Sequence, residues 1–166
     1  MNPKGNNTIL ITGGGSGIGR GLAEAFHKLG NKVIIAGRRK NVLEAVVAAN
    51  PGMAFEILDV QDPAKLKSFA AEITSKFPSL NVLLNMAGIM QTEDLLNAPD
   101  PSVIDATIAT NFTAPLQLTA ALLPHLKQQA QATVINVSSG LAFTPTYCAT
   151  KAAIHSWSIS LRHQLR

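Results

Sequence analysis

A tyrosine and a lysine near the C-terminal end have the types and the spacing that acid–base chemistry requires. Tyr147 and Lys151 stand four residues apart in a segment, 146–165, whose pattern predicts a helix. Residues four apart share one face of a helix, so the Lys151 ammonium can lie near the Tyr147 phenol. A nearby cation favours the phenolate, which makes proton exchange near neutral pH feasible. Ser138 and Ser139 close an apolar run, and a hydroxyl there can hydrogen-bond the same substrate oxygen.

A glycine-rich stretch near the N-terminus predicts a site for a pyrophosphate. It reads Thr12-Gly13-Gly14-Gly15-Ser16-Gly17-Ile18-Gly19 and separates the apolar run 8–11 from an amphipathic segment that reaches about Leu29. Glycines between a strand and a helix let the backbone approach phosphate, and the helix N-terminus adds unpaired N–H groups. A plain turn with glycine caps is the alternative. The position between strand and helix favours dinucleotide binding.

Basic residues after the second apolar run bear on which dinucleotide would bind. At this point of a dinucleotide fold an Asp or Glu bonds the ribose of NAD, whereas an Arg accommodates the 2′-phosphate of NADP. The chain carries Arg38 and Arg39 here, and the nearest acid downstream is Glu44, inside the next predicted helix. The planar guanidinium of Arg38 suits a phosphate group. Solvated residues at a helix start are the alternative, but cations are slightly unfavourable there. The sequence therefore favours NADP over NAD.

Short β-branched runs alternate with longer helical patterns along the chain, which is typical of a parallel α/β sheet. Asp62 is a predicted N-cap with Pro63 at the first helical position. We expect an α/β fold, a doubly wound parallel sheet of the Rossmann type, in a single domain over residues 1–166. The expected strands are 8–11, 33–36, 55–58, 82–84 and 133–137; the expected helices follow the glycine loop and then span 41–49, 62–76, 102–127 and 146–165.

These motifs together resemble the shorter, non-extended branch of the short-chain dehydrogenase/reductase family. The pattern Thr-Gly-x-x-x-Gly-Ile-Gly at 12–19 is similar to its cofactor signature. Asn85-Met86-Ala87-Gly88 resembles the family's Asn-Asn-Ala-Gly, with Met86 as a departure, and Asn111 resembles its helix asparagine. The stretch 138–156 looks like the DltE-like oxidoreductase subgroup. The resemblance covers nearly the whole chain.

The resemblance implies a role for each residue that matches the catalytic pattern. Tyr147 would be the general acid/base, and Ser139 would orient the substrate oxygen. Lys151 would tune Tyr147 and bond the nicotinamide ribose, while Asn111 would sustain a proton relay.

The resemblance also implies a cofactor site at the ends of several strands. Asp59 and Val60 resemble the pair that contacts the adenine, although a lone Asp before a helix could equally be a turn residue. Asn85 would support the sheet edge and the cofactor, and Ala87 and Gly88 would allow close approach. The expected cofactor-binding residues are Thr12, Gly13, Ser16, Gly17, Ile18, Gly19, Arg38, Arg39, Asp59, Val60, Asn85, Ala87, Gly88, Tyr147 and Lys151.

Two departures from the family pattern concern the C-terminal part. Five strands are expected here, and the family's later strands and its substrate-lid region have no counterpart before Arg166. The family also places its Tyr farther from its Ser than the eight positions between Ser139 and Tyr147. This short spacing would pull Tyr147 against the strand end, so we expect several residues to be missing between Ser139 and Pro145.

Composition narrows the classes of protein to consider. The 166 residues are 46% hydrophobic, with a net charge of +4 and basic residues scattered except at 38–40, which does not indicate a nucleic-acid binder. No apolar run is long enough for a membrane span, and the polar start lacks a signal-peptide core. A single cysteine, Cys148, fits a reducing cytoplasm. Four scattered histidines predict no metal site.

Two function hypotheses follow. The first is an NADP-dependent oxidoreductase that transfers a hydride between nicotinamide and a small carbonyl or alcohol, and whose Asn111 and Tyr147 helices form a homo-oligomer, as the family resemblance implies. The second is a non-catalytic dinucleotide-binding or sensing module without a substrate lobe. A sugar-nucleotide epimerase of the extended branch is disfavoured by the glycine spacing and the chain length. The sequence does not identify the substrate.

Overall fold

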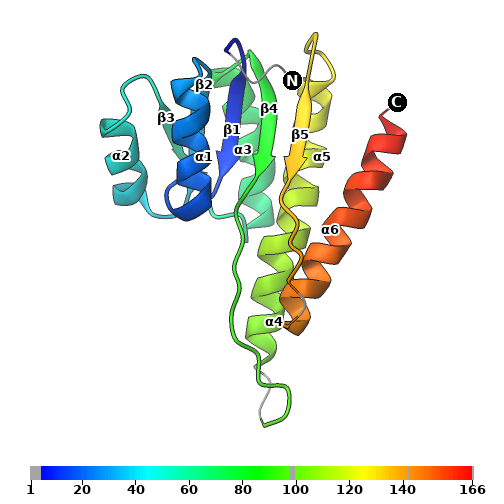
Figure 1. Ribbon diagram of the computed structural model, residues 1–166. Coiled ribbons are helices and arrows are strands. Elements are labelled where there is room, and N and C mark those ends of the chain that lie inside the picture. Colours follow the sequence, from blue (N-terminus) through cyan, green and yellow to red (C-terminus); the bar gives the residue numbers. More distant parts are fainter. Residues whose placement is uncertain (1–4, 98–99, 142, 166) are drawn as a thin grey trace.

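Parallel strands form one central sheet in the computed structural model, which describes residues 5–97, 100–141 and 143–165 (Figure 1). The strand order is β3-β2-β1-β4-β5, so the chain starts in the middle, moves to one edge and then crosses to the other. This reversal at β1 makes the sheet doubly wound and confirms the predicted fold class. The strands are β1 (Thr8–Thr12), β2 (Lys32–Gly37), β3 (Ala54–Ile57), β4 (Leu80–Asn85) and β5 (Thr133–Asn136).

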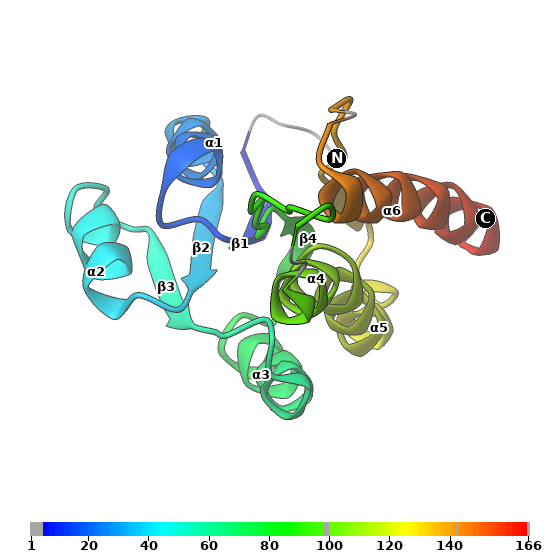
Figure 2. The same cartoon turned by 90° about the horizontal axis from the view of Figure 1, so that it is seen from below.

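Helices cover both faces of the sheet, which is why the central strands are apolar throughout. Seen from below, α1 and α2 lie on one side of the sheet, and α3, α4 and α5 lie on the other (Figure 2). Side chains alternate along a strand, so Ile9 and Ile11 of β1 pack with Leu43 of α2, while Leu10 packs with Leu118 of α5. The helices are α1 (Gly17–Lys28), α2 (Lys40–Ala48), α3 (Pro63–Lys76), α4 (Pro101–Ile108), α5 (Ala114–Leu126) and α6 (Pro145–Gln164).

The long helix predicted over 102–127 differs from a regular helix at its centre. Between α4 and α5 the chain forms a π-helical turn, η1 (Ala109–Thr113), which contains Asn111. Pro115 has no N–H, so the Asn111 carbonyl has no regular helical donor four residues later. Wider turns of this kind often occur at functional sites. The structure therefore places the irregularity of this helix at a predicted site residue.

The carboxyl ends of the parallel strands lie at one edge of the sheet, the lower edge in Figure 1. The glycine loop and the loops after β2, β3, β4 and β5 gather there. The start of α3 at this edge agrees with prediction, because Asp62 accepts hydrogen bonds from the amides of Ala64 and Lys65, each at 3.1 Å. Within the described ranges, no helix has both the length and the apolar character that a membrane crossing requires.

Candidate active site

The glycine loop between β1 and α1 is packed too closely for side chains at two positions. Gly13 has a φ of 70°, and a Cβ built on it would lie 2.9 Å from the Cα of Ala87. A Cβ on Gly19 would lie 2.3 Å from the carbonyl oxygen of Gly13. The Thr12 hydroxyl accepts hydrogen bonds from the amides of Met86 and Ala87, both at 3.1 Å. These contacts fix the glycine loop against the end of β4.

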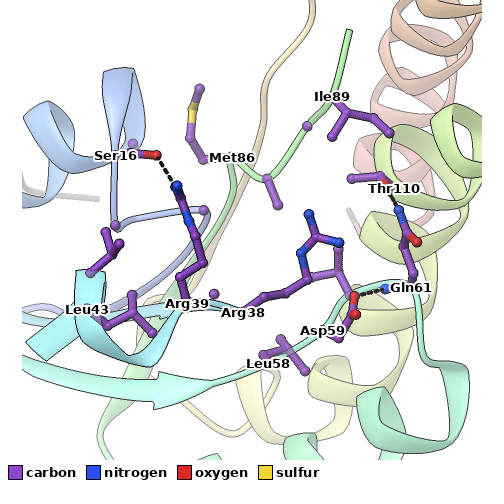
Figure 3. Close-up of a pocket in the computed structure, with 18 of the residues that line it drawn as sticks. Ser16, Arg38, Arg39, Leu43, Leu58, Asp59, Gln61, Met86, Ile89 and Thr110 are labelled. Carbon is purple, nitrogen blue, oxygen red and sulfur yellow. Dashed lines mark hydrogen bonds between the residues drawn. The ribbon is translucent and has the colours of Figure 1, made fainter. Parts of the chain in front are cut away.

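A cavity of about 420 Å³ opens beside the glycine loop (Figure 3). Most of the predicted cofactor-binding residues line it: Gly13, Ser16, Ile18, Gly19, Arg38, Arg39, Asp59, Val60, Ala87 and Gly88. Thr12, Gly17, Asn85, Tyr147 and Lys151 are outside its lining. The predicted cofactor-binding residues therefore lie mostly around this cavity, whereas the two on α6, Tyr147 and Lys151, do not line it.

Several lining residues were missed by the sequence interpretation: Gly15, Gly37, Val42, Leu43, Leu58, Gln61, Met86, Ile89 and Thr110. Gln61 and Thr110 are joined by a hydrogen bond of 2.7 Å between Nε2 and Oγ1, and they close the cavity on the side of η1. They are 49 positions apart in the chain, so no local spacing indicates the pair. Met86, by contrast, stands next to Ala87 within the Asn-Met-Ala-Gly motif, so its position could have indicated the contact.

The charge of the cavity fits an anionic dinucleotide. Arg38 and Arg39 reach into it from the turn after β2, and both are exposed to solvent (Figure 3). Arg39 donates a hydrogen bond of 3.1 Å from Nη2 to the Ser16 hydroxyl at the start of α1. Asp59 is the one acidic residue of the lining, and its Oδ1 accepts from the Gln61 amide at 3.0 Å. The two guanidinium groups and the amides of the α1 N-terminus could therefore hold phosphate groups.

Tyr147 and Lys151 lie together on α6, as their spacing predicts. The Lys151 ammonium is 5.7 Å from the centre of the Tyr147 ring. It also donates a hydrogen bond of 2.9 Å to the carbonyl oxygen of Val137, just beyond β5. Lys151 is buried, and burial lowers the pKa of its ammonium. The pair is therefore tied to the end of β5 through the lysine.

The two serines after β5 have different surroundings. The Ser138 hydroxyl donates a hydrogen bond of 2.9 Å to the Lys151 carbonyl and so fastens α6 to the strand end. Ser139 is exposed, and its hydroxyl accepts from the Leu141 amide at 3.1 Å. α6 begins at Pro145, which leaves only a short connection in which position 142 is outside the described residues. Lys151 therefore lies at the end of β5 even though only eight positions separate Ser139 from Tyr147.

Asn111 connects the two halves of the site. Its side chain forms two hydrogen bonds of 2.8 Å with the backbone of Ile89, one to the amide and one to the carbonyl. A Cβ built on Gly88 would lie 3.3 Å from Asn111 Oδ1 and 3.7 Å from Lys151 Nζ. Since Gly88 also lines the cavity, the cavity leads directly to the Asn111 and Lys151 side chains.

Asn85 has a supporting position at the end of β4. Its Nδ2 donates to the Thr119 hydroxyl at 3.1 Å and to Asn136 Oδ1 at 2.8 Å, and the residue is buried. These bonds join β4 to α5 and β5 behind the cavity wall. Across the described part of the chain, no group of three or more His, Cys, Asp and Glu side chains is placed to hold a metal ion.

Comparison with known proteins agrees with this geometry. A family model described as short chain dehydrogenase matches residues 7–166. The oxidoreductase DltE of Bacillus subtilis is 43% identical over 167 residues, covering 97% of this chain and 66% of DltE. Serine 3-dehydrogenase of Agrobacterium fabrum is 39% identical over 173 residues, covering 96% of this chain and 66% of that enzyme. The chain thus spans just under two thirds of the length of these two relatives.

A solved structure of a short chain dehydrogenase from Escherichia coli, complexed with NADPH, matches the fold with a TM-score of 0.91 and 26% identity. The match covers 100% of this chain and 75% of that one. The family match spans the glycine loop, the cavity and the Tyr147–Lys151 pair. The chain therefore belongs to the short-chain dehydrogenase/reductase family of oxidoreductases and, within it, to the DltE-like subgroup.

Proposed function

We propose that the protein is an NADP(H)-dependent oxidoreductase that transfers a hydride between nicotinamide and a carbonyl or alcohol. The observation that carries this proposal is the continuity of the site. The cavity extends from Arg38 and the glycine loop to Gly88, which lies beside the ammonium of Lys151 on the helix of Tyr147. NADP(H), when bound, supplies or accepts the hydride.

The preference for NADP rests on Arg38 and Arg39. Their guanidinium groups stand after β2, where an acidic residue would instead favour the ribose hydroxyl of NAD. The Escherichia coli relative described above has NADPH bound in its solved structure, which supports the same preference.

Tyr147 carries the proton in this proposal. As a carbonyl is reduced, the phenol gives its proton to the oxygen that becomes the alcohol; in oxidation the phenolate takes the proton back. The Lys151 ammonium, held by Val137, stabilises the phenolate electrostatically. Ser139, whose hydroxyl is exposed, orients the substrate oxygen by donating a hydrogen bond.

Asn111 links this proton to solvent in the same proposal. Its Oδ1 accepts from the Ile89 amide and keeps a second lone pair, which could bind a water of a proton relay. Asn85 acts indirectly, by holding the end of β4 in place.

A titration of the purified chain with NADPH and with NADH tests the cofactor part of the proposal. Consumption of NADPH in the presence of small carbonyl compounds tests the catalytic part. Since two relatives have the name serine 3-dehydrogenase, small hydroxy compounds such as serine are the first substrates for the reverse reaction. Absence of NADPH binding would contradict the whole proposal.

A binding or sensing module is the second candidate function. The observation that favours it is the short connection after β5, in which the Ser139 hydroxyl already accepts a hydrogen bond from Leu141. Tight NADPH binding without turnover of any carbonyl or alcohol would support this module over the oxidoreductase.

A homo-oligomer through the helices of Asn111 and Tyr147 is part of the proposal. Ile108 of α4 is 39% exposed and Ile159 of α6 is 55% exposed, so both helices present apolar surface. Light scattering coupled to size exclusion gives the mass in solution, and a monomer at all concentrations would contradict this part alone.

A further inference from the structure

The first turn of α6 lacks the cap that its own sequence would normally provide. The first backbone N–H groups of a helix have no acceptor within the helix, and the side chain of the residue before the helix usually accepts one of them. Here that residue is Thr144, and its side chain makes no capping hydrogen bond. Pro145 has no N–H, so Thr146 has the first amide of α6 that needs an acceptor from outside the helix. Tyr147 is the next residue, so the capping of Thr146 concerns the turn that carries the phenol.

Glu93 supplies the acceptor from a distant loop. Its Oε2 accepts a hydrogen bond of 2.9 Å from the Thr146 amide, across 53 positions of the chain. The helix dipole also favours a carboxylate at the N-terminus of a helix. Residues 90–93 and 143–145 line a common hollow of about 130 Å³, so the loop after β4 borders the start of α6 over several residues. The bond therefore replaces the local cap and joins α6 to this loop.

The same loop also contacts the other parts of the site. Gly88 lines the dinucleotide cavity, and the backbone of Ile89 forms two hydrogen bonds of 2.8 Å with the Asn111 side chain. Glu93 follows in the same loop and bonds the turn of Tyr147. One continuous segment therefore links the cavity, Asn111 and the start of α6.

Lys151 is held from another direction. Its ammonium donates to the Val137 carbonyl and its own carbonyl accepts from the Ser138 hydroxyl, each at 2.9 Å, and both partners directly follow β5. These bonds hold α6 one turn after Tyr147, whereas helices fray first at their ends. The spacing between the phenol and the ammonium therefore depends on two anchors, the end of β5 for Lys151 and Glu93 for the first turn.

Glu93 holds this position at a cost to stability. Its Oε1 is buried and, among the residues that the structure describes, has no hydrogen-bond partner. Burying a carboxylate oxygen without a donor is unfavourable, and such a group calls for an explanation. A threonine, which is itself a good capping residue, stands at 144, so the helix alone does not need the distant carboxylate. The arrangement therefore points to the placement of α6 against the loop after β4.

We propose that Glu93 is a positioning residue for Tyr147. By bonding the Thr146 amide, it fixes the first turn of α6 against the loop after β4 and so keeps the phenol in place relative to the cavity and to Lys151. The chemistry tolerates little displacement, since a misplacement of about 1 Å can lower a rate by about 10²-fold. The inference rests on the proposed function, because it assigns a further residue to that same site.

Glu93→Ala removes the acceptor of the Thr146 amide. With the first carbonyl or alcohol that the wild-type chain turns over, we expect kcat to fall by roughly 10–10²-fold. The Kd of NADPH should change by less than about twofold, because Glu93 is not part of the cavity lining. This split between kcat and cofactor affinity is what a residue that only supports the fold would not produce.

Two further measurements need no turnover. The chain has one tyrosine, so tyrosine ring signals in NMR spectra report Tyr147 alone. In Glu93→Ala we expect these signals to move and the Thr146 amide to exchange with solvent at least about tenfold faster. Should Glu93→Ala fail to fold, Glu93→Asp, which withdraws the carboxylate by one methylene, takes its place in the same comparison.

Two variants separate the hydrogen bond from the charge and from the loop. Glu93→Gln removes the charge but keeps an oxygen for the Thr146 amide, so kcat and the Thr146 exchange rate should return to within about threefold of wild type. Asp94→Ala is the matched control: it removes the carboxylate of the next position, which bonds the Leu96 and Asn97 amides within the loop. It should leave the Tyr147 ring signals and kcat nearly unchanged.

Each contrary result has a separate meaning. An unchanged Thr146 exchange rate in Glu93→Ala, or equal losses of kcat in Glu93→Ala and Glu93→Gln, would overturn the proposal. A loss of NADPH affinity as large as the loss of kcat would show that Glu93 only supports the fold, and would overturn it as well. A wild-type chain that binds NADPH but turns over no carbonyl or alcohol would contradict the proposed function. The exchange rate and the ring signals would then decide by themselves whether Glu93 positions Tyr147.

Discussion

The two halves of the sheet hold their functional residues in different ways. On the side of β1 and β2, backbone packs against backbone: Gly13 and Gly19 leave no room for a side chain, and Thr12 bonds two amides of the neighbouring loop. On the side of β5, every strand residue is only half-buried. Tyr147 and Lys151 lie on a helix that is joined to the neighbouring loops by hydrogen bonds between a side chain and the backbone, from Lys151 to the Val137 carbonyl and from the Thr146 amide to Glu93. In Figure 1 the loop after β4 extends well below the sheet, alongside α4.

This difference indicates that cofactor binding and catalysis depend on different structural supports. The dinucleotide half is built into the central strands, so its shape should change little when a residue of the catalytic half is replaced. The catalytic half depends on a few long-range hydrogen bonds, such as the one between Glu93 and Thr146. Cofactor binding and turnover should therefore respond to different substitutions.

Tyr147→Phe should separate the two halves most strongly. It removes the proton donor, and general acid–base groups contribute roughly 10²–10⁴-fold to a rate, so kcat should fall by about that factor. The ring remains to pack near Lys151, and NADPH affinity should change by less than about twofold. Steady-state kinetics and calorimetry measure the two quantities.

The outcome of that substitution also tests the assigned role. A kcat close to that of the wild-type chain would remove Tyr147 from the chemistry. A large loss of NADPH affinity would make it mainly a binding residue and would contradict the separation between the halves.

Arg38→Asp should act on the dinucleotide half alone. It replaces the guanidinium in the cavity by a repelling carboxylate, so NADPH binding should weaken by about 1–3 kcal/mol. NADH affinity should stay the same or improve, because an acid at this point bonds the ribose hydroxyl. Titration of both cofactors against both chains decides the matter; equal losses for NADH and NADPH would refute a contact with the 2′-phosphate.

Sequence patterns predicted the parts of the site whose residues lie close together in the chain. The glycine loop, the Asp62 cap, and the Tyr147–Lys151 pair all follow from local spacing. Glu93 did not, because its partner Thr146 is 53 positions away and a single Glu in a loop has no distinguishing pattern.

The π-helical turn at Asn111 was also missed, for a related reason. A helical pattern of apolar residues continues through 102–127 and hides a local widening of the backbone. The pattern also gives no information about the loop after β4. The backbone amide and carbonyl of Ile89 in this loop form hydrogen bonds with the two polar ends of the Asn111 side chain. Contacts between residues that are distant in the sequence, such as Asn111 and Ile89, could therefore not be predicted from the sequence pattern.

Two glycines of α1 offer a matched test of the packing on the dinucleotide side. Gly19→Ala would place a Cβ against the Gly13 carbonyl, and overpacking of this kind costs about 1–3 kcal/mol of unfolding free energy. Gly21→Ala meets no atom within 4 Å and should instead stabilise α1, by about 0.5–1 kcal/mol. Urea unfolding compares them, and equal stabilities for the two variants would contradict the close packing of the glycine loop.

Lys151→Met should have the smallest effect, and it appears in the pH dependence of stability. Burial lowers the pKa of Lys151 in the folded chain, while the unfolded chain keeps the ordinary value of 10.5. Between these values the unfolded state binds more protons, so the unfolding free energy of the wild-type chain rises with pH. The cost of burying the charge is fully present below the folded-state pKa and is relieved as the pH approaches 10.5. Lys151→Met lacks this term, so its stability relative to wild type should decline over that range. Urea unfolding at a series of pH values measures the slope, with Lys65→Met on the exposed side of α3 as the control.

Parallel curves for wild type and Lys151→Met would mean that the ammonium is well solvated, and the Val137 contact would then not hold it in the protein interior.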